Sequence, residues 1–305
     1  MTWQSCVENC QLTVQTGTGT SLSQVSTLQY ALFTDVHRNL AVVCIFYFAT
    51  MITCVSHQLL FITSWLSFHR FASSFSVQIA PETTAIQRQS VKKVLAEVYG
   101  TENSDQWQQR RSEARIVGEE DESLNIPLDE LVYGELGIDA LATILDAVGV
   151  NKGDNFLDIG AGDGMLVTGA SMLYPDFLEA SIGAEIVPDL YERSLEFQSG
   201  LERLLEMNQS EENILLCPQT SLHLGNCYQP HDELKGIFSN TTLAVCFATA
   251  WCRGIPGRKL ERLSEALGTD GVSELPAGAR LVIIDGVLDH QRDGFDLKGE
   301  LKFFW

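Results

Sequence analysis

The second half of the chain alternates two kinds of hydrophobic pattern. Ile138, Leu141, Leu145 and Val148 recur with the spacing of one helix face, and Gly149 can end that helix. Short, nearly continuous apolar runs are typical of strands buried on both faces of a parallel sheet. Such runs occur at 155–159, 179–186, 221–226, 235–240 and 280–285, and further helical patterns occur at 165–173, 188–205 and 260–267. The alternation predicts a doubly wound, mostly parallel α/β domain over residues 126–305.

The first 125 residues are organised differently. Residues 1–39 are rich in Ser, Thr and Gln and have no periodicity, which predicts an exposed, disordered tail. Pro81 and the apolar face that follows it predict a helix ending at Gly100, and residues 101–125 are polar and charged. We therefore expect 81–125 to form a helix and a charged linker that precede the α/β domain.

An apolar segment occupies residues 40–70. No Asp, Glu, Lys or Arg lies between Arg38 and Arg70, and residues 40–66 exceed the about 20 residues that a membrane-spanning helix needs. A chain that starts at Met51 would instead open with an apolar run followed by an Ala/Ser/Phe segment, as in the presequences of algae with secondary plastids. We expect a membrane or targeting element that serves location; a buried soluble helix and a misassigned start codon are the alternatives.

The chain is strongly acidic, and the charge is unevenly placed. Asp and Glu number 40 against 20 Lys and Arg, a net charge of −20, and residues 127–305 hold 29 acids and 12 bases, or −17. This balance argues against strong nucleic-acid binding and favours a basic partner. The eight cysteines form no C-x-x-C pair and have no histidine at zinc spacing. We therefore expect a monomer with neither a metal site nor a disulfide scaffold.

The glycine-rich turn after the first strand of this domain is the main candidate for ligand binding. It reads DIGAGDG (158–164), a G-x-G-x-G spacing at the carboxyl end of a strand, where doubly wound sheets bind their ligands. The dinucleotide fingerprint needs a glycine where this chain has Met165, which disfavours NAD. S-adenosylmethionine carries no phosphate and needs close backbone and an acid for its ammonium. The expected contacts to this cofactor are Asp158, Gly160, Ala161, Gly162 and Gly164.

Two further polar residues end the next predicted strands. Glu185 lies 27 residues after Asp158, where a carboxylate can accept hydrogen bonds from both ribose hydroxyls. Asn226 ends the third strand, where its amide oxygen could accept from the adenine amino group, although asparagine also favours turns for local reasons. Three matched elements in chain order favour a cofactor site over a simple tight turn.

Three segments resemble successive motifs of one enzyme family: VYGELGIDALATILDAVGV (132–150), NFLDIGAGDGMLV (155–167) and GAEIVPDLYE (183–192). They look like motifs of the disruptor-of-telomeric-silencing family, the non-SET histone lysine methyltransferases with a class I methyltransferase fold. The resemblance covers about residues 130–290. It implies an S-adenosylmethionine-dependent methyltransferase that acts on lysine in a histone or another basic protein, and it implies a nuclear location, whereas segment 40–70 would imply a membrane or organelle.

The resemblance also assigns roles to single residues. Tyr133 and Glu135 match the loop that closes over the methionine end of the cofactor, and Asn240 matches the family's asparagine beside the transferred methyl group. These three residues are the implied catalytic residues. The implied cofactor contacts are Tyr133, Gly134, Glu135, Gly160, Gly162, Glu185 and Asn240.

The chain departs from the family's pattern in three places. Cys227 stands where the family has a phenylalanine at the adenine, and Thr241 and Thr242 stand where the family builds its lysine channel. The final antiparallel hairpin of a class I sheet is represented by at most one strand, GELKFFW (299–305). These departures leave two alternatives open, a small-molecule methyltransferase of the same fold and a catalytically degenerate cofactor-binding module.

Overall fold

The computed structural model describes residues 25–32, 78–100, 134, 136–207, 216–248, 258–289 and 293–304, together with Gln109 and Ser112, and gives the backbone alone for 25–32 and 300–304. The apolar segment 40–70 therefore lies outside the described residues, as do most of 1–39 and most of 101–133. Within the part of the chain that is described, no helix is both long enough and apolar enough to cross a membrane.

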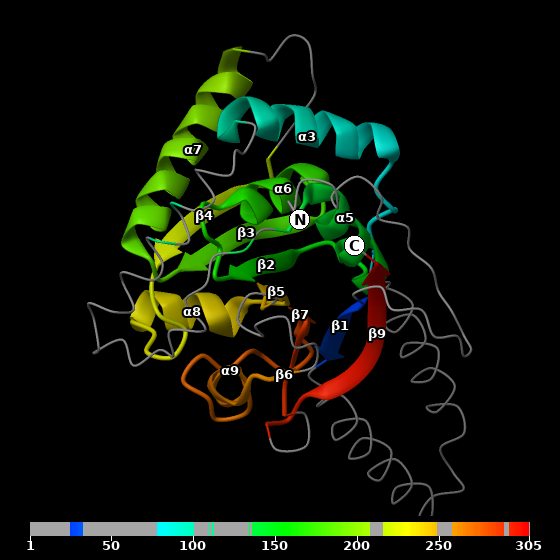
Figure 1. Ribbon diagram of the computed structural model, residues 1–305, viewed down its shortest axis with the longest axis vertical. Helices are drawn as coiled ribbons and strands as arrows, with labels where there is room; N and C mark the ends of the chain where they lie inside the picture. Colours follow the sequence, from blue (N-terminus) through cyan, green and yellow to red (C-terminus); the bar gives the residue numbers. More distant parts are fainter. Residues whose placement is uncertain are drawn as a thin grey trace, which may run out of the picture.

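A seven-stranded sheet in the order β4-β3-β2-β5-β7-β1-β9 forms the centre of the domain (Figure 1). Neighbouring strands among β4, β3, β2, β5 and β7 pair in parallel, and β1 pairs antiparallel with both β7 and β9. After β2, the strands β3 and β4 are added on one side of the sheet, whereas β5 and β7 are added on the other side. The switch point therefore lies between β2 and β5. The bounds are β1 (Val25–Leu32), β2 (Asp154–Ile159), β3 (Leu178–Glu185), β4 (Gln219–Leu224), β5 (Leu243–Phe247), β7 (Arg280–Ile284) and β9 (Asp296–Phe304). A separate parallel pair joins β6 (Arg258–Lys259) to β8 (Gly286–Val287).

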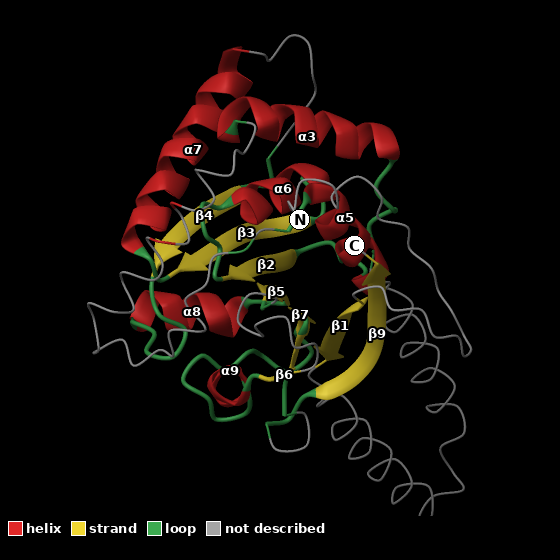
Figure 2. Cartoon of the chain, in the orientation of Figure 1, coloured by secondary structure: helices red, strands yellow, loops and turns green. Residues whose placement is uncertain are grey.

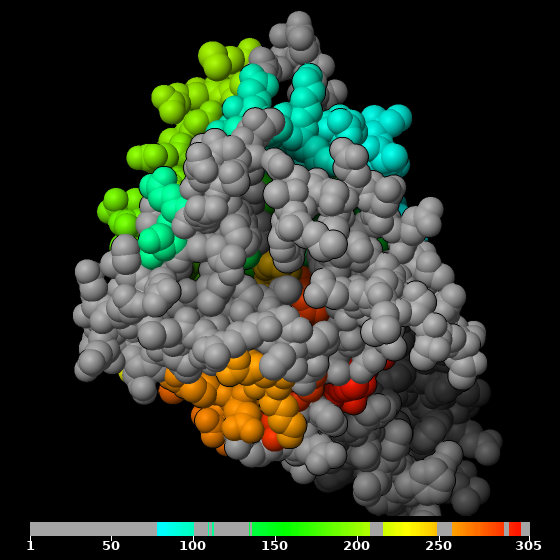
Figure 3. Space-filling view, viewed as in Figure 1, coloured from blue at the N-terminus to red at the C-terminus, as the bar shows by residue number. Residues whose placement is uncertain are grey.

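Helices cover both faces of the sheet (Figure 2). On one face lie α3 (Ala85–Tyr99), α5 (Ile138–Val148), α6 (Met165–Leu173) and α7 (Pro188–Met207); on the other lie α8 (Asp232–Asn240) and α9 (Glu261–Leu267). In the space-filling view, the cyan surface of α3 lies near the top and the orange segment that includes α9 lies well below it (Figure 3). The doubly wound α/β architecture predicted from the sequence is confirmed.

The strands are apolar throughout because both of their faces are buried. In β2, Phe156 packs into the core beneath α5 and α6, whereas Leu157 and Ile159 pack into the core with α8 and α9. Val245 and Cys246 of β5 divide between the two cores in the same way, since successive side chains of a strand point to opposite faces. Full burial of one large apolar side chain contributes about 1.5–3 kcal/mol, so the two cores together fix the register of the strands.

Residues 78–100 are part of the domain and do not merely precede it. Helix α3 contacts α5, α6 and α7. The Asp146 carboxylate of α5 accepts hydrogen bonds from the Thr83 backbone N–H (3.0 Å) and hydroxyl (2.8 Å), from Arg88 (2.7 Å) and from the Tyr174 hydroxyl (2.6 Å). Burial, and then the hydrogen bond to Asp146, raises the pKa of Tyr174. The helix predicted after Pro81 is therefore present, but it packs within the domain that the sequence analysis began at residue 126.

Two local predictions are wrong. Residues 235–240 belong to helix α8, in which Leu234 and Phe238 are buried one turn apart; the parallel strand is β5, which the sequence analysis did not predict. His231 caps α8, because its ring nitrogen accepts from the Leu234 N–H (3.3 Å). Residues 25–32, expected to lie in a disordered tail, form strand β1, which pairs with β7 and β9.

Candidate functional site

The turn between β2 and α6 is built on three glycines with left-handed backbone. The φ angles are +80° at Gly160, +57° at Gly162 and +83° at Gly164, and Gly164 caps the N-terminus of α6. A residue with a Cβ is strained in this region, so the G-x-G-x-G spacing follows from the backbone path of the turn. The turn is also hydrogen-bonded to β3, because the N–H groups of Gly160 and Ala161 donate to the Ala184 carbonyl of that strand (2.9 and 3.1 Å).

Glu185, the last residue of β3, ties this turn to the neighbouring strand. One carboxylate oxygen, Oε2, accepts from the Gly162 N–H (2.6 Å), and Oε1 accepts from the N–H groups of Ile186 (2.9 Å) and Val187 (2.8 Å). Burial raises the pKa of Glu185 to about 7; the three backbone hydrogen bonds oppose that rise and the charge of Asp163 adds to it. A carboxylate has about four acceptor positions, so Oε2 retains one for a ligand hydroxyl.

Asp158 is the buried acid of the site that lacks a full set of partners. Only 1% of the residue is exposed, and its Oδ1 atom has no hydrogen-bond partner among the described residues. Burial, and secondarily the charge of Glu185, raises the pKa of Asp158 from 3.8 to about 8. Leaving a buried carboxylate oxygen without a partner is costly, so the site is suited to a ligand that brings a cationic hydrogen-bond donor.

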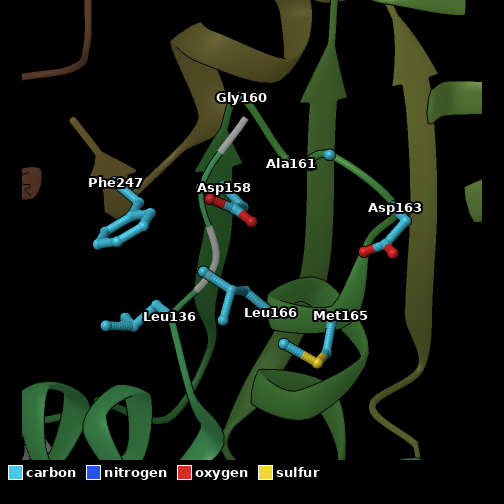
Figure 4. Close-up of a pocket in the computed structure, with 10 residues that line it drawn as sticks. Leu136, Asp158, Gly160, Ala161, Asp163, Met165, Leu166 and Phe247 are labelled. Carbon is cyan, nitrogen blue, oxygen red and sulfur yellow. The ribbon is translucent and has the colours of Figure 1, made fainter. Parts of the chain in front are cut away.

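Asp158 lines a pocket whose other walls are largely apolar (Figure 4). The close-up places Phe247, from the end of β5, on one side of the Asp158 carboxyl group, and the turn with Ala161 and Asp163 on the other. None of the lining residues is basic. They are Gly134, Leu136, Asp158, Gly160, Ala161, Gly162, Asp163, Met165, Leu166 and Phe247. The pocket therefore combines acids and apolar walls, a combination suited to a cationic ligand with apolar parts.

The segment before α5 reaches the same pocket. Gly134 and Leu136 line it. The contact of Gly134 with the cofactor stays a prediction. Tyr133 and Glu135, expected to close over the methionine end, lie outside the described residues. Their roles remain predictions.

Asn226 follows β4 at the same edge of the sheet as Glu185. The Gly225 N–H donates to the Glu185 carbonyl (2.7 Å), and the buried Asn226 side-chain oxygen accepts from the Tyr228 N–H (2.8 Å). The asparagine therefore shapes its own turn, the local role that the sequence analysis kept open. It follows the strand that pairs with the one carrying Glu185.

Asn240 does not lie where the sequence analysis placed it. It is exposed at the last turn of α8, where its side-chain amide donates to the Gly236 carbonyl (2.8 Å). Its own carbonyl accepts from the side chain of Asn155, which stands near the start of β2, so Asn240 lies at the amino edge of the sheet, opposite the glycine turn. The error follows from taking 235–240 as a strand, which moved a helix end to the carboxyl edge.

Thr241 and Thr242 also belong to the amino edge. The Thr241 hydroxyl donates to the Ile237 carbonyl (2.9 Å), and the Thr242 hydroxyl accepts from the Asn155 N–H (2.9 Å) and donates to Asp154 (2.8 Å). These threonines therefore do not build the acceptor side. Phe247 is one of the pocket residues that the sequence analysis missed, and the apolar run LAVCF (243–247) would have indicated it as the end of a strand.

Comparisons with known proteins agree with this site. Residues 116–207 match the model of the family described as histone methylation protein DOT1. This stretch of the chain is DOT1-like. It contains α5, the glycine turn, α6, β3 with Glu185, and α7, so the family resemblance drawn from the sequence is confirmed.

Other proteins are similar at greater distance. The ribosomal RNA small subunit methyltransferase G of Shewanella pealeana is 25% identical over 163 residues, which are 49% of this chain and 70% of that protein. Among solved structures, MtNAS in complex with MTA and tNA matches with 16% identity and a TM-score of 0.28, over 56% of this chain and 57% of that one. The magnesium protoporphyrin IX methyltransferase of Synechocystis PCC 6803 with bound SAH matches with 12% identity and a TM-score of 0.25, over 55% and 62%.

The chain thus spans less than two thirds of these two solved structures. The strand order and the match of residues 116–207 to the DOT1 model support a class I methyltransferase domain. The domain is an S-adenosylmethionine-dependent methyltransferase of the class I type, as the sequence predicted.

Proposed function

We propose that this protein transfers a methyl group to a lysine side chain of a basic protein such as a histone, and that the glycine turn after β2 holds its cofactor. The observation that carries the proposal is the combination of Asp158 and the DOT1-like segment that surrounds it. A buried carboxylate oxygen without a partner faces a pocket with apolar walls. The matched family is described as a histone methylation protein.

The residues of the pocket fit S-adenosylmethionine. Asp158 offers the missing anionic partner for the α-ammonium group, and Glu185 retains an acceptor position for one ribose hydroxyl. The left-handed glycines allow the ligand to touch backbone without meeting a side chain. Asn226 follows the next strand of the sheet, β4, and would lie nearest the adenine.

The protein's contribution to catalysis is orientation and exclusion of water. When bound, S-adenosylmethionine supplies an electrophilic methyl group on a sulfonium sulfur. Leu136, Leu166 and Phe247 make that end of the pocket apolar. A lysine amine needs a free lone pair, although free lysine titrates near 10.4, and an apolar surrounding lowers the pKa of the ammonium that enters it. Neither a covalent enzyme intermediate nor a metal is required for this in-line transfer.

The charge of the domain supports a basic acceptor. Residues 127–305 carry a net charge of −17. Such a surface attracts a basic protein, and the attraction falls with added salt, because exposed charges are screened beyond about 8–10 Å at physiological ionic strength.

Calorimetry with S-adenosylmethionine on the full-length chain tests the cofactor site. Glu185→Ala removes a charge-assisted acceptor worth about 1.5–3 kcal/mol, so we expect the Kd to rise about 10-fold to 150-fold. Gly162→Val places a branched side chain at a φ of +57° and should abolish measurable binding. Glu179→Ala, at the exposed start of the same strand, and Gly153→Val, at a φ of +86° at the amino edge of the sheet, are the matched controls. Equal affinity in the site variants and their controls would show that the cofactor binds elsewhere.

Transfer of a radiolabelled methyl group tests the acceptor. The wild-type protein is given labelled cofactor with core histones, with bulk protein, or with a lipid and metabolite extract. We expect label in histone lysine, and less of it as salt rises. Label confined to small molecules supports the small-molecule alternative, and cofactor binding without any transfer supports a degenerate module.

A further inference from the structure

A methyltransferase pocket has to bind its cofactor in two forms that differ in charge. S-adenosylmethionine carries a positive sulfonium sulfur, whereas the product S-adenosylhomocysteine has a neutral thioether in the same place. Both molecules have the α-ammonium, the ribose and the adenine, so the contacts proposed for Asp158, Glu185 and Asn226 are available to both. A side chain that separates the cofactor from the product must therefore act at the sulfur.

Phe247 lies on the opposite side of the switch point from the strands of the ribose and adenine contacts. It ends β5, and its neighbour Cys246 is paired in parallel register with Ile159 of β2, so Phe247 and Gly160 leave two adjacent strands at the same level. Figure 4 shows the Phe247 ring beside the carboxyl group of Asp158, the proposed partner of the ammonium. A short carbon chain joins that ammonium to the sulfur, which places the ring at the methionine end of the pocket.

The Phe247 side chain is supported by the core and still reaches the pocket. It is half-buried and packs against the core cluster that contains Leu136 and Leu166, two further residues of the pocket lining. Its neighbours along β5, Val245 and Cys246, are fully buried. The strand end therefore fixes the ring where the pocket begins.

The chemistry of the lining makes this ring different from the other walls. Among the described residues that line the pocket, Phe247 is the aromatic one, and none is basic. An aromatic face carries partial negative charge and attracts a cation within about 6 Å of the ring centroid, most strongly where water is excluded. Leu136 and Leu166 offer dispersion contacts alone, which a neutral sulfur and a sulfonium share.

We propose that the aromatic face of Phe247 binds the sulfonium of S-adenosylmethionine and makes this site prefer the cofactor over the neutral product. The inference rests on the cofactor site of the proposed function and deepens it, and it applies to any methyl acceptor. The contact is made to the cofactor by a neutral ring, so an acceptor amine stays free to lose its proton. A product that loses this contact is more readily exchanged for fresh cofactor.

Three substitutions isolate the ring. Phe247→Leu keeps an apolar side chain but removes the aromatic face, whereas Phe247→Tyr retains that face. Asp158 and Asp163, whose charges also favour a positive ligand, stay in place in both variants. Phe177→Leu is the matched control, because Phe177 is also half-buried against the same core but directly precedes β3, at the amino edge. Phe247→Met serves as a second variant without a ring if the leucine variant folds poorly.

Calorimetry on the full-length variants measures the Kd of S-adenosylmethionine and, separately, of S-adenosylhomocysteine. We expect Phe247→Leu to raise the Kd of S-adenosylmethionine about 5-fold to 30-fold, the value of a desolvated cation–π contact. The Kd of S-adenosylhomocysteine should change by about 3-fold at most, because a similar apolar surface remains. The ratio of the two Kd values in Phe247→Tyr and in Phe177→Leu should match that of the wild type.

An equal rise of both Kd values in Phe247→Leu overturns the proposal, because that result assigns the ring to packing. A wild-type ratio in both Phe247→Leu and Phe247→Met overturns it as well. Wild-type protein that binds neither molecule overturns the cofactor site and this inference together. A wrong acceptor is visible separately, since it changes the transfer of label and leaves the two Kd values as they are.

Discussion

The two ends of strand β2 carry buried aspartates with opposite environments. Asp154 begins the strand, is 5% exposed, and accepts hydrogen bonds from the Arg280 guanidinium, the Thr242 hydroxyl (2.8 Å) and the Asn151 N–H (2.6 Å). Asp158, four residues on, is 1% exposed, and within the described part of the chain its Oδ1 atom has no partner. One strand thus holds a neutralised acid at its amino end and an unsatisfied acid at its carboxyl end.

The difference separates an acid that holds the fold together from an acid that is kept for a ligand. At the amino edge, Arg280 of β7 reaches Asp154 and also donates to the Gly149 carbonyl, so it ties β7 to β2 and to the end of α5. At the carboxyl edge, burial raises the pKa of Asp158 to about 8, with the charge of Glu185 adding to the effect, and the pocket lining includes no basic residue. The desolvation cost at Asp158 is left for a bound cation to offset.

The largest expected effect comes from breaking the amino-edge pair. Arg280→Met leaves the Asp154 carboxylate buried without its cation, and removal of one partner from a buried ion pair costs about 3–5 kcal/mol. We expect the free energy of unfolding to fall by that amount in chemical denaturation. Asp154→Asn combined with Arg280→Met should recover part of the loss. A change below about 1 kcal/mol in the single variant would show that Asp154 does not depend on Arg280.

Asp158→Asn should raise the free energy of unfolding of the ligand-free protein, whereas Arg280→Met lowers it. The folded-state pKa of about 8 lies above the unfolded value of 3.8, so between these values the unfolded state binds fewer protons. The stability contributed by this group is therefore fully present below about pH 4 and is lost as the pH rises toward and through about 8. We expect Asp158→Asn to raise the stability at pH 8 by about 1 kcal/mol or more, which is roughly 2–4 °C in Tm for a domain of this size.

Thermal unfolding between about pH 5 and pH 8 checks this prediction. The difference in Tm between Asp158→Asn and wild type should grow with pH, while the S-adenosylmethionine affinity of the variant should fall. Glu185 titrates in the same direction, with a pKa of about 7 against 4.5, so both proteins retain its share of the pH dependence. A Tm difference that does not vary with pH would mean that Asp158 is ionised throughout.

The smallest expected effect is at an exposed ion pair, whose acid is neither buried nor left without a partner. Lys92 Nζ and Asp139 Oδ2 are 2.7 Å apart, with side chains 44% and 51% exposed. Solvated pairs of this kind contribute about 0.2–1 kcal/mol. We expect Lys92→Met to change the free energy of unfolding by less than about 0.5 kcal/mol in chemical denaturation. A loss as large as that of Arg280→Met would show that distance alone, and not burial, decides the value of an ion pair here.

The sequence predicted those parts of the fold and the site whose signal is local. Gly160, Gly162 and Gly164 have positive φ angles, and Glu185 lies at the end of the next strand, as the spacing indicated. The predicted segments at 155–159, 179–186, 221–226 and 280–285 correspond to β2, β3, β4 and β7. In these places the periodicity and the turn residues agree with each other, so short-range pattern was sufficient.

The errors arose where a short segment could form either a helix or a strand. The run 235–240 has apolar residues in its middle, and only the burial of Leu234 and Phe238 against the sheet decides that it is helical. Because 235–240 is a helix and 243–247 is the strand, Asn240 lies at the amino edge of the sheet and Phe247 lines the pocket. The strand at 25–32 was missed because its pairing partners, β7 and β9, lie more than 240 residues away in sequence.

The sequence by itself determined the fold class, the cofactor type and the glycine turn, because hydrophobic period and left-handed glycines are properties of neighbouring residues. Only the tertiary structure decided which acids are paired. Asp154 and Asp158 are separated by four residues and are both buried, yet Arg280 reaches one of them and not the other. That choice depends on which strands are adjacent and on which edge each side chain lies, and these relations exist only once the sheet has formed.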